Sequence, residues 1–93
     1  MPQRRVALIT GAACGIGRAI ALQLAANNQD IAVNDLPNTS EESKNLQRDI
    51  EALGSRMAFF PADVSKQKEV RDMVESVRTF FGRIDILINN AGI

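Results

Sequence analysis

The sequence predicts an α/β fold, in which a doubly wound parallel β-sheet carries helices on both faces. Along the chain, four short apolar runs rich in strand-forming residues alternate with three stretches that have the periodicity of helices. The order β-α-β-α-β-α-β leads to a parallel sheet, because each strand is joined to the next by a right-handed crossover through a helix. A glycine-rich turn after the first run is typical of the first strand-to-helix connection of such sheets. No linker, repeat or low-complexity segment divides the 93 residues, which predicts a single domain.

The predicted strands are apolar and bounded by turn residues, as is typical of strands buried on both faces of a sheet. They cover residues 5–10, 31–35, 56–60 and 84–88, and Pro61 ends the third. The doubly wound pattern favours the strand order 3-2-1-4, which places the fourth strand at an edge. We therefore expect an uncovered apolar edge there, suited to pairing with another chain or to aggregation.

The first helix is predicted over residues 16–26, a segment rich in Ala and Leu. Ile16, Ile20 and Leu24 recur at a spacing of four, and we expect this side of the helix to lie on apolar surface. The asparagine pair at 27–28 ends the helix, because Asn tolerates the left-handed conformation that helix ends often require.

The second and third helices have recognisable start and stop residues. Thr39 and Glu42 form a T-x-x-E capping box at the start of the second helix, and Gly54 ends it. Ser65 is the predicted N-cap of the third helix, which Gly82 ends. The apolar positions are Leu46, Ile50 and Leu53 in the second helix and Val70, Met73, Val74, Val77, Phe80 and Phe81 in the third.

The composition excludes several classes of function. Eleven basic residues balance eleven acidic ones without a block of like charge, so neither nucleic acid nor an anionic membrane is predicted as a partner. Cys14 is the only cysteine and histidine is absent, so an internal disulfide and the usual zinc sites are excluded, and no metal ligand is predicted. The N-terminal MPQRR leads into too few apolar residues for a signal peptide or a membrane span, which favours a cytoplasmic protein.

The glycine-rich turn, TGAACGIG at residues 10–17, has the properties of an anion-binding loop. It lies where the first strand turns into the first helix, and backbone amides at a helix start attract an anion. Gly11 allows the tight turn, Gly15 lets a pyrophosphate approach the backbone, and Gly17 lets the helix pack closely on the strand. The spacing G-x-x-x-G-x-G departs from G-x-G-x-x-G, and a glycine-rich turn without a ligand is the alternative.

Cys14 lies inside this turn, and two interpretations are open for it. A thiolate stabilised by helix-start amides would be reactive and would suit a redox switch that blocks cofactor binding. The favoured interpretation is that Cys14 occupies a variable loop position without such a role.

Asp35 stands at the carboxyl end of the second strand, near the distance from the glycine turn expected of the acidic residue that binds a ribose 2′-hydroxyl. Its carboxylate would repel the 2′-phosphate of NADP. No Arg or Lys stands at Cys14, Asn34 or Leu36 to neutralise that phosphate. The sequence therefore predicts NAD in preference to NADP, and the alternative is a turn aspartate with nothing bound.

Two signatures resemble those of the short-chain dehydrogenase/reductase family. TGAACGIG matches the family's T-G-x-x-x-G-[IL]-G loop, and NNAG at residues 89–92 matches its second signature. The likeness covers all 93 residues and implies the N-terminal part of a Rossmann-type, NAD(P)-binding domain. It implies that the loop backbone binds pyrophosphate, that Asp63 and Val64 contact the adenine, and that the NNAG segment supports the sheet and the adenosine ribose. With Asp35, the implied cofactor-binding residues are Thr10, Gly11, Ala13, Cys14, Gly15, Ile16, Gly17, Leu36, Asp63, Val64, Asn89, Asn90, Ala91 and Gly92.

The resemblance also implies hydride transfer between a nicotinamide and an alcohol or ketone, such as a sugar alcohol or a 3-oxoacyl thioester. The family uses a Ser and a Tyr-x-x-x-Lys pair, but the 93 residues contain no Tyr and no His, so no catalytic residue is predicted. We expect the cofactor half of a longer dehydrogenase, inactive by itself, whose substrate site and dimeric or tetrameric assembly belong to the complete protein. The alternatives are an NAD-binding module without catalysis and a structural chain whose fourth strand docks on a partner.

Overall fold

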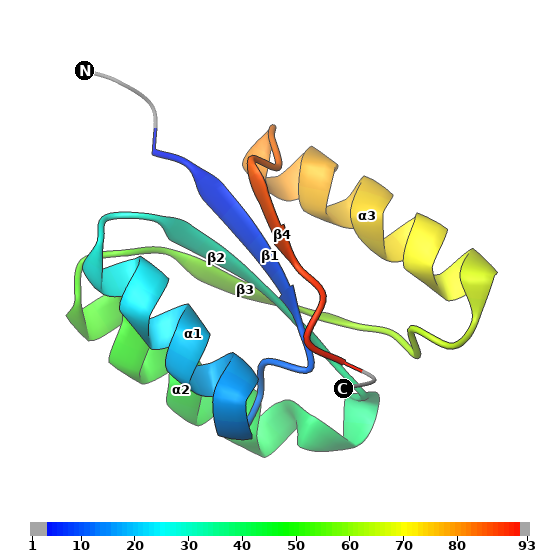
Figure 1. The fold of residues 1–93 in the computed structure, drawn as a ribbon, viewed down its shortest axis with the longest axis horizontal. Helices are drawn as coiled ribbons and strands as arrows, with labels where there is room; N and C mark the ends of the chain where they lie inside the picture. Colours follow the sequence, from blue (N-terminus) through cyan, green and yellow to red (C-terminus); the bar gives the residue numbers. More distant parts are fainter. Residues whose placement is uncertain (1–3, 92–93) are drawn as a thin grey trace.

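The structure is a computed structural model that describes residues 4–91, and in this range it contains a four-stranded parallel sheet between two helical layers (Figure 1). The elements are β1 (Val6–Thr10), α1 (Gly15–Ala26), β2 (Asp30–Asp35), the 3₁₀ helix η1 (Pro37–Thr39), α2 (Ser40–Ala52), β3 (Met57–Pro61), α3 (Gln67–Phe81) and β4 (Ile86–Ile88). The strand order is β3-β2-β1-β4. The predicted fold class and strand order are therefore confirmed.

Both faces of the sheet are covered, α1 and α2 lying on one face and α3 on the other (Figure 1). Successive side chains of β1 alternate between the two faces, so that Ile9 packs under α1 and α2 while Leu8 packs under α3. Every residue of β1 is buried, as the prediction from its continuous apolar run requires. β4 is an edge strand in which Leu87 is 63% exposed, as expected for the fourth strand.

The predicted contact face of α1 is confirmed at Ile20 and Leu24 and wrong at Ile16. Ile16 is 70% exposed, whereas Ile20 and Leu24 are partly buried and pack against the core. The buried face of α1 consists of small residues, Gly17, Ala21 and Ala25. Small side chains let the helix axis lie close to the sheet, so the larger residues of α1 are displaced to its flanks.

The two predicted N-caps have different outcomes, because Thr39 is the N-cap residue of α2 but forms no side-chain capping bond, whereas Ser65 is not the N-cap of α3. Thr39 is also the last residue of η1, and its hydroxyl donates to the carbonyl of Leu36 (2.8 Å) instead of forming the predicted capping box. Ser65 donates its N–H and its hydroxyl to Asp63 (3.0 and 2.7 Å), and α3 begins two residues later at Gln67. In each case a local turn bond uses the hydroxyl, a known competitor of capping.

The predicted stop residues are confirmed, since Asn28, Gly54 and Gly82 have positive φ angles of 68°, 89° and 82°. The apolar faces of the second and third helices are confirmed except at Leu53 and Phe80, which are 47% and 57% exposed. Within residues 4–91, no helix is both long and apolar enough to cross a membrane. In the same range no three His, Cys, Asp or Glu side chains are grouped to hold a metal ion.

Candidate functional site

The loops that follow the four strands meet at the carboxyl edge of the sheet and enclose a cavity of about 380 Å³. Parallel sheets of this kind bind ligands at this edge. The cavity brings together many of the residues predicted from the sequence, and Gly92 lies outside the described residues. The lining residues are Gly11, Cys14, Asn34, Asp35, Leu36, Ala62, Asp63, Val64, Asn90 and Ala91.

The glycines at positions 11, 15 and 17 meet three different requirements. Gly11 and Gly15 have φ angles of +64° and +65°, a conformation that residues with a Cβ rarely adopt. A Cβ on Gly15 would meet nothing within 4 Å, so the backbone at this helix start is open to an approaching group. A Cβ on Gly17 would lie 2.4 Å from the Gly11 carbonyl oxygen and 2.6 Å from Nδ2 of Asn90. Gly17 therefore lacks a side chain chiefly because the Gly11 carbonyl of the same loop and the side chain of Asn90 occupy that space.

Thr10 ties the segment after β4 to the end of β1. Thr10 is only 5% exposed, and its Oγ1 accepts hydrogen bonds from the backbone N–H groups of Asn90 and Ala91 (both 3.0 Å). Oγ1 also lies 3.4 Å from Oδ1 of Asn89. In return Asn90 donates through Nδ2 to the Gly11 carbonyl (3.1 Å). These bonds hold the NNA residues against the glycine-rich loop.

Asp35 ends β2 beside the same loop. Oδ2 accepts a hydrogen bond from the Ala13 N–H (3.0 Å), and Oδ1 accepts one from the Leu36 N–H (2.8 Å). None of the ion pairs found within residues 4–91 involves Asp35. A carboxylate that accepts from two backbone amides has acceptor capacity left for a hydroxyl group.

The segment after β3 supplies Asp63 and Val64 to the cavity. Hydrogen bonds from the Ser65 side chain and backbone hold the pKa of Asp63 below its usual 3.8, so the group is ionised at neutral pH. The Asp63 N–H donates to Oε1 of Glu69 (2.9 Å), which joins this segment to the first turn of α3.

The sequence reasoning missed two positioning residues, Asn34 and Glu69. Asn34 is 1% exposed, and its Nδ2 donates to the carbonyls of Phe60 (3.0 Å) and Ala62 (3.3 Å). It therefore fixes the path of the chain from β3 toward Asp63. A polar residue inside the apolar run IAVND was the available signal. Glu69 gave no such signal, because it resembles an ordinary solvated residue of a helix start.

Cys14 is an exposed free thiol and occupies the N-cap position of α1 without a side-chain capping bond. It lines the cavity.

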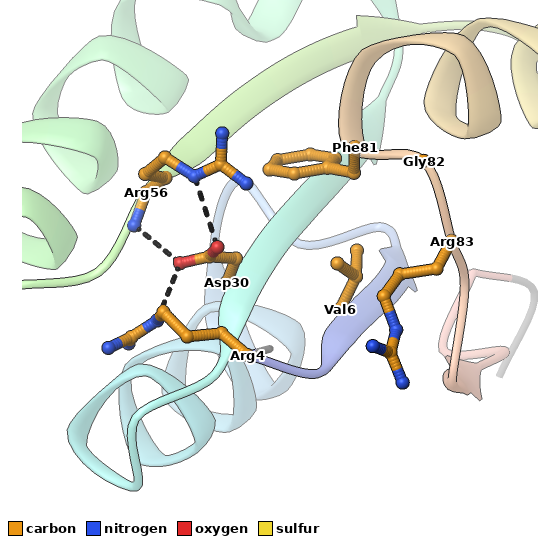
Figure 2. A pocket seen from close by; sticks show the side chains of 7 residues that line it. All are labelled: Arg4, Val6, Asp30, Arg56, Phe81, Gly82 and Arg83. Carbon is orange, nitrogen blue, oxygen red and sulfur yellow. Dashed lines mark hydrogen bonds and ion pairs between the residues drawn. The ribbon is translucent and has the colours of Figure 1, made fainter. Parts of the chain in front are cut away.

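A second cavity, of about 400 Å³, lies at the amino edge of the sheet and is shown in Figure 2. Asp30 lies between Arg4 and Arg56, its Oδ1 and Oδ2 accepting from the two Nε groups (3.0 and 3.1 Å). Oδ1 also accepts from the Arg56 N–H (2.9 Å), and the Arg56 guanidinium lies 5.1 Å from the Phe81 ring centroid. Burial would raise the pKa of Asp30, but the Arg56 hydrogen bonds and the charges of Arg56 and Arg4 outweigh it and lower the pKa. This cavity contains a structural ion network.

The carboxyl-edge site therefore has the architecture of a nucleotide-binding α/β domain. The profile of the short chain dehydrogenase family matches residues 5–93, and the chain belongs to this family.

Individual relatives agree with this assignment. The chain is 43% identical over 95 residues to a short-chain dehydrogenase/reductase of Hericium erinaceus, covering 100% of this chain and 38% of that protein. It superposes with a TM-score of 0.88 and 40% identity on a 3-oxoacyl-[acyl-carrier protein] reductase of Brucella melitensis in complex with NAD, covering 100% of this chain and 35% of that one. A metagenomic short-chain oxidoreductase in complex with NADP gives a TM-score of 0.87 at 31% identity, covering 96% of this chain and 39% of that one. The chain thus spans less than half the length of these relatives.

Proposed function

We propose that residues 10–91 form the dinucleotide-binding half of an NAD(P)-dependent short-chain oxidoreductase. The observation that carries the proposal is the carboxylate of Asp35, which lies within hydrogen-bond reach of the glycine-rich loop at the open carboxyl-edge cavity. The loop backbone would bind the pyrophosphate, Asp35 the adenosine ribose, and Asp63 and Val64 the adenine. Bound dinucleotide supplies or accepts a hydride, and these residues hold it in place.

The preferred cofactor in this proposal is NAD. An adenosine ribose with a free 2′-hydroxyl can donate to the Asp35 carboxylate, whereas a 2′-phosphate would meet its negative charge. The described cavity offers no counter-charge, since no Arg or Lys is among the residues that line it. Relatives bound to NAD and to NADP are both known, so this preference depends on the residues of the site.

The complete reaction in this proposal is hydride transfer between the nicotinamide and an alcohol or ketone. A sugar alcohol and a 3-oxoacyl thioester are the candidate substrate classes, and the Brucella relative is a reductase of the second kind. The general acid of the family is a Tyr, and the 93 residues contain none. We therefore propose that these residues alone bind dinucleotide without turning it over, in a protein that forms dimers or tetramers when complete. NADH production from any alcohol by the purified 93-residue chain would contradict this part.

Calorimetric titration with NAD and NADP tests the proposal, with a matched pair of variants at Gly15. Position 15 is open to solvent and has a positive φ, which Asp and Asn both tolerate better than other residues. Gly15→Asp places a negative charge at the pyrophosphate position, whereas Gly15→Asn adds a side chain of the same shape without charge. We expect NAD to bind the wild type more tightly than NADP does, and Gly15→Asp to lose at least about 10-fold more affinity than Gly15→Asn. Equal affinities of the two variants, or no dinucleotide binding by the folded wild type, would refute the pyrophosphate site.

A further inference from the structure

Residues 11–13 of the glycine-rich loop are held to β2 and to Asn90 by three hydrogen bonds. The Ala12 N–H donates to the Asn34 carbonyl (3.1 Å), and the Gly11 carbonyl accepts from Nδ2 of Asn90. The third bond joins the Ala13 N–H to Oδ2 of Asp35. Two positive-φ glycines flank Ala12 and Ala13, so the backbone itself provides little stiffness. The shape of the loop therefore depends strongly on these bonds.

The hydrogen bond from the Ala13 N–H to Asp35 is the one that connects the loop to β2 through a side chain. It is partly buried, whereas the second bond of this carboxylate, from the Leu36 N–H, is exposed to solvent. If the carboxylate is removed, water can therefore hydrogen-bond to the Leu36 N–H more easily than to the Ala13 N–H. An ionised carboxylate has about four acceptor positions, so it can keep the Ala13 N–H while it accepts from a ribose hydroxyl.

We propose that Asp35 is a positioning residue for the glycine-rich loop as well as the residue that selects the ribose. This inference rests on the proposed function, and it adds that the carboxylate holds the loop in its binding shape before any dinucleotide arrives. Asp35 therefore affects NADP in two opposite ways. Its charge repels the 2′-phosphate, while its hydrogen bond to Ala13 supports the backbone that binds the pyrophosphate common to both cofactors.

Amide hydrogen exchange of the ligand-free protein tests the loop contact directly. We expect Asp35→Ala to accelerate exchange at Ala13 about 10-fold or more, and Asp35→Asn to change it much less, because the one Asn oxygen can still face the partly buried Ala13 N–H. The Ile31 N–H, which donates to Arg56 in the sheet (2.9 Å), reports global unfolding and is expected to be unchanged. Asp72→Ala, which removes an exposed carboxylate of α3, is the matched control and is expected to leave Ala13 unchanged.

Titration with NADP supplies the second test. If Asp35 holds the loop, Asp35→Asn removes the repulsion of the 2′-phosphate but keeps the hydrogen bond from the Ala13 N–H. We then expect Asp35→Asn to bind NADP at least about 5-fold more tightly than Asp35→Ala does. Equal NADP affinities of the two variants would overturn the proposal, as would unchanged exchange at Ala13 or equal acceleration at Ala13 and Ile31. Failure of every form to bind either dinucleotide would refute the proposed function, while the exchange result would still decide the role of Asp35 in the loop.

Discussion

The two ends of β2 carry the same residue type in opposite roles. At the amino end, Asp30 has a side chain only 2% exposed, bound by two guanidinium groups and a backbone N–H. At the carboxyl end, Asp35 binds two backbone N–H groups and enters no ion pair within the described residues. Each end has a cavity of similar size. The difference shows that the charge partners of a strand-end carboxylate, and not the volume beside it, distinguish a structural network from a candidate ligand site.

The direction of the sheet explains this division. In a parallel sheet the helix N-termini, with their free amides, follow the carboxyl ends of the strands. Asp35 therefore lies among N–H donors that suit anions and hydroxyl groups. Asp30 lies where no helix begins, and arginines at positions 4 and 56 provide its partners.

The largest loss of stability is expected from adding one methyl group to the glycine-rich loop at the carboxyl edge of the sheet. Gly17→Ala would bring a Cβ to 2.4 Å from the Gly11 carbonyl oxygen, and neither that backbone nor Asn90 can move without breaking the bond between them. We expect a loss of about 3 kcal/mol in the free energy of unfolding, measured by urea denaturation. Gly15→Ala is the control, since it has open space but keeps a positive φ, and is expected to lose about 1 kcal/mol. Equal losses would show that the close approach at Gly17 is not the cause.

Removal of the carboxylate at the amino end should lower stability by a smaller amount. Asp30→Ala deletes the acceptor of Arg4, of the Arg56 side chain and of the Arg56 N–H. Because both arginine side chains are partly solvated, at 37% and 62% exposure, we expect a loss of about 2 kcal/mol and not the full cost of isolated buried charges. Asp72→Ala, which removes an exposed pair with Lys68, should change the free energy of unfolding by less than about 0.5 kcal/mol. A loss at Asp30 no larger than at Asp72 would contradict the structural role of the network.

The smallest effect concerns acid stability. The pKa of Asp30 lies below its unfolded value of 3.8, because the arginine contacts outweigh the effect of burial. Hydrogen bonds from Arg83 and from the Val6 N–H likewise lower the pKa of Asp85. A carboxyl group with a lowered folded pKa stabilises the protein above the unfolded pKa, and this contribution is lost as the pH falls through the folded pKa. The free energy of unfolding should therefore decrease as the pH falls below 3.8, and it should decrease less steeply in Asp30→Asn than in the wild type. An identical slope in that variant would show that Asp30 is not linked to folding.

The sequence predicted the fold and the sheet edge at which the candidate residues meet, because both depend on periodicity and on glycine and strand-end positions. The strand order and the convergence of Gly11, Asp35, Asp63 and Asn90 on one edge are confirmed. The contact face of α1 was predicted only in part, because hydrophobicity alone does not reveal that the closest packing selects the small residues Gly17, Ala21 and Ala25. The predicted capping bond of Thr39 and the predicted N-cap position of Ser65 were wrong, because a hydroxyl can bond within its own turn and that competition depends on the backbone path.

The most direct test of the account is to make one substitution at both ends of β2 and titrate each variant with NAD. Asp35→Asn should bind NAD about 10-fold more weakly than the wild type, through loss of a charged acceptor, whereas Asp30→Asn should bind within about 2-fold of it. Both titrations are made at a temperature at which circular dichroism shows both variants to be folded. Unchanged NAD affinity in Asp35→Asn, or an equal loss in Asp30→Asn, would contradict the claim that the carboxyl-edge aspartate recognises the cofactor.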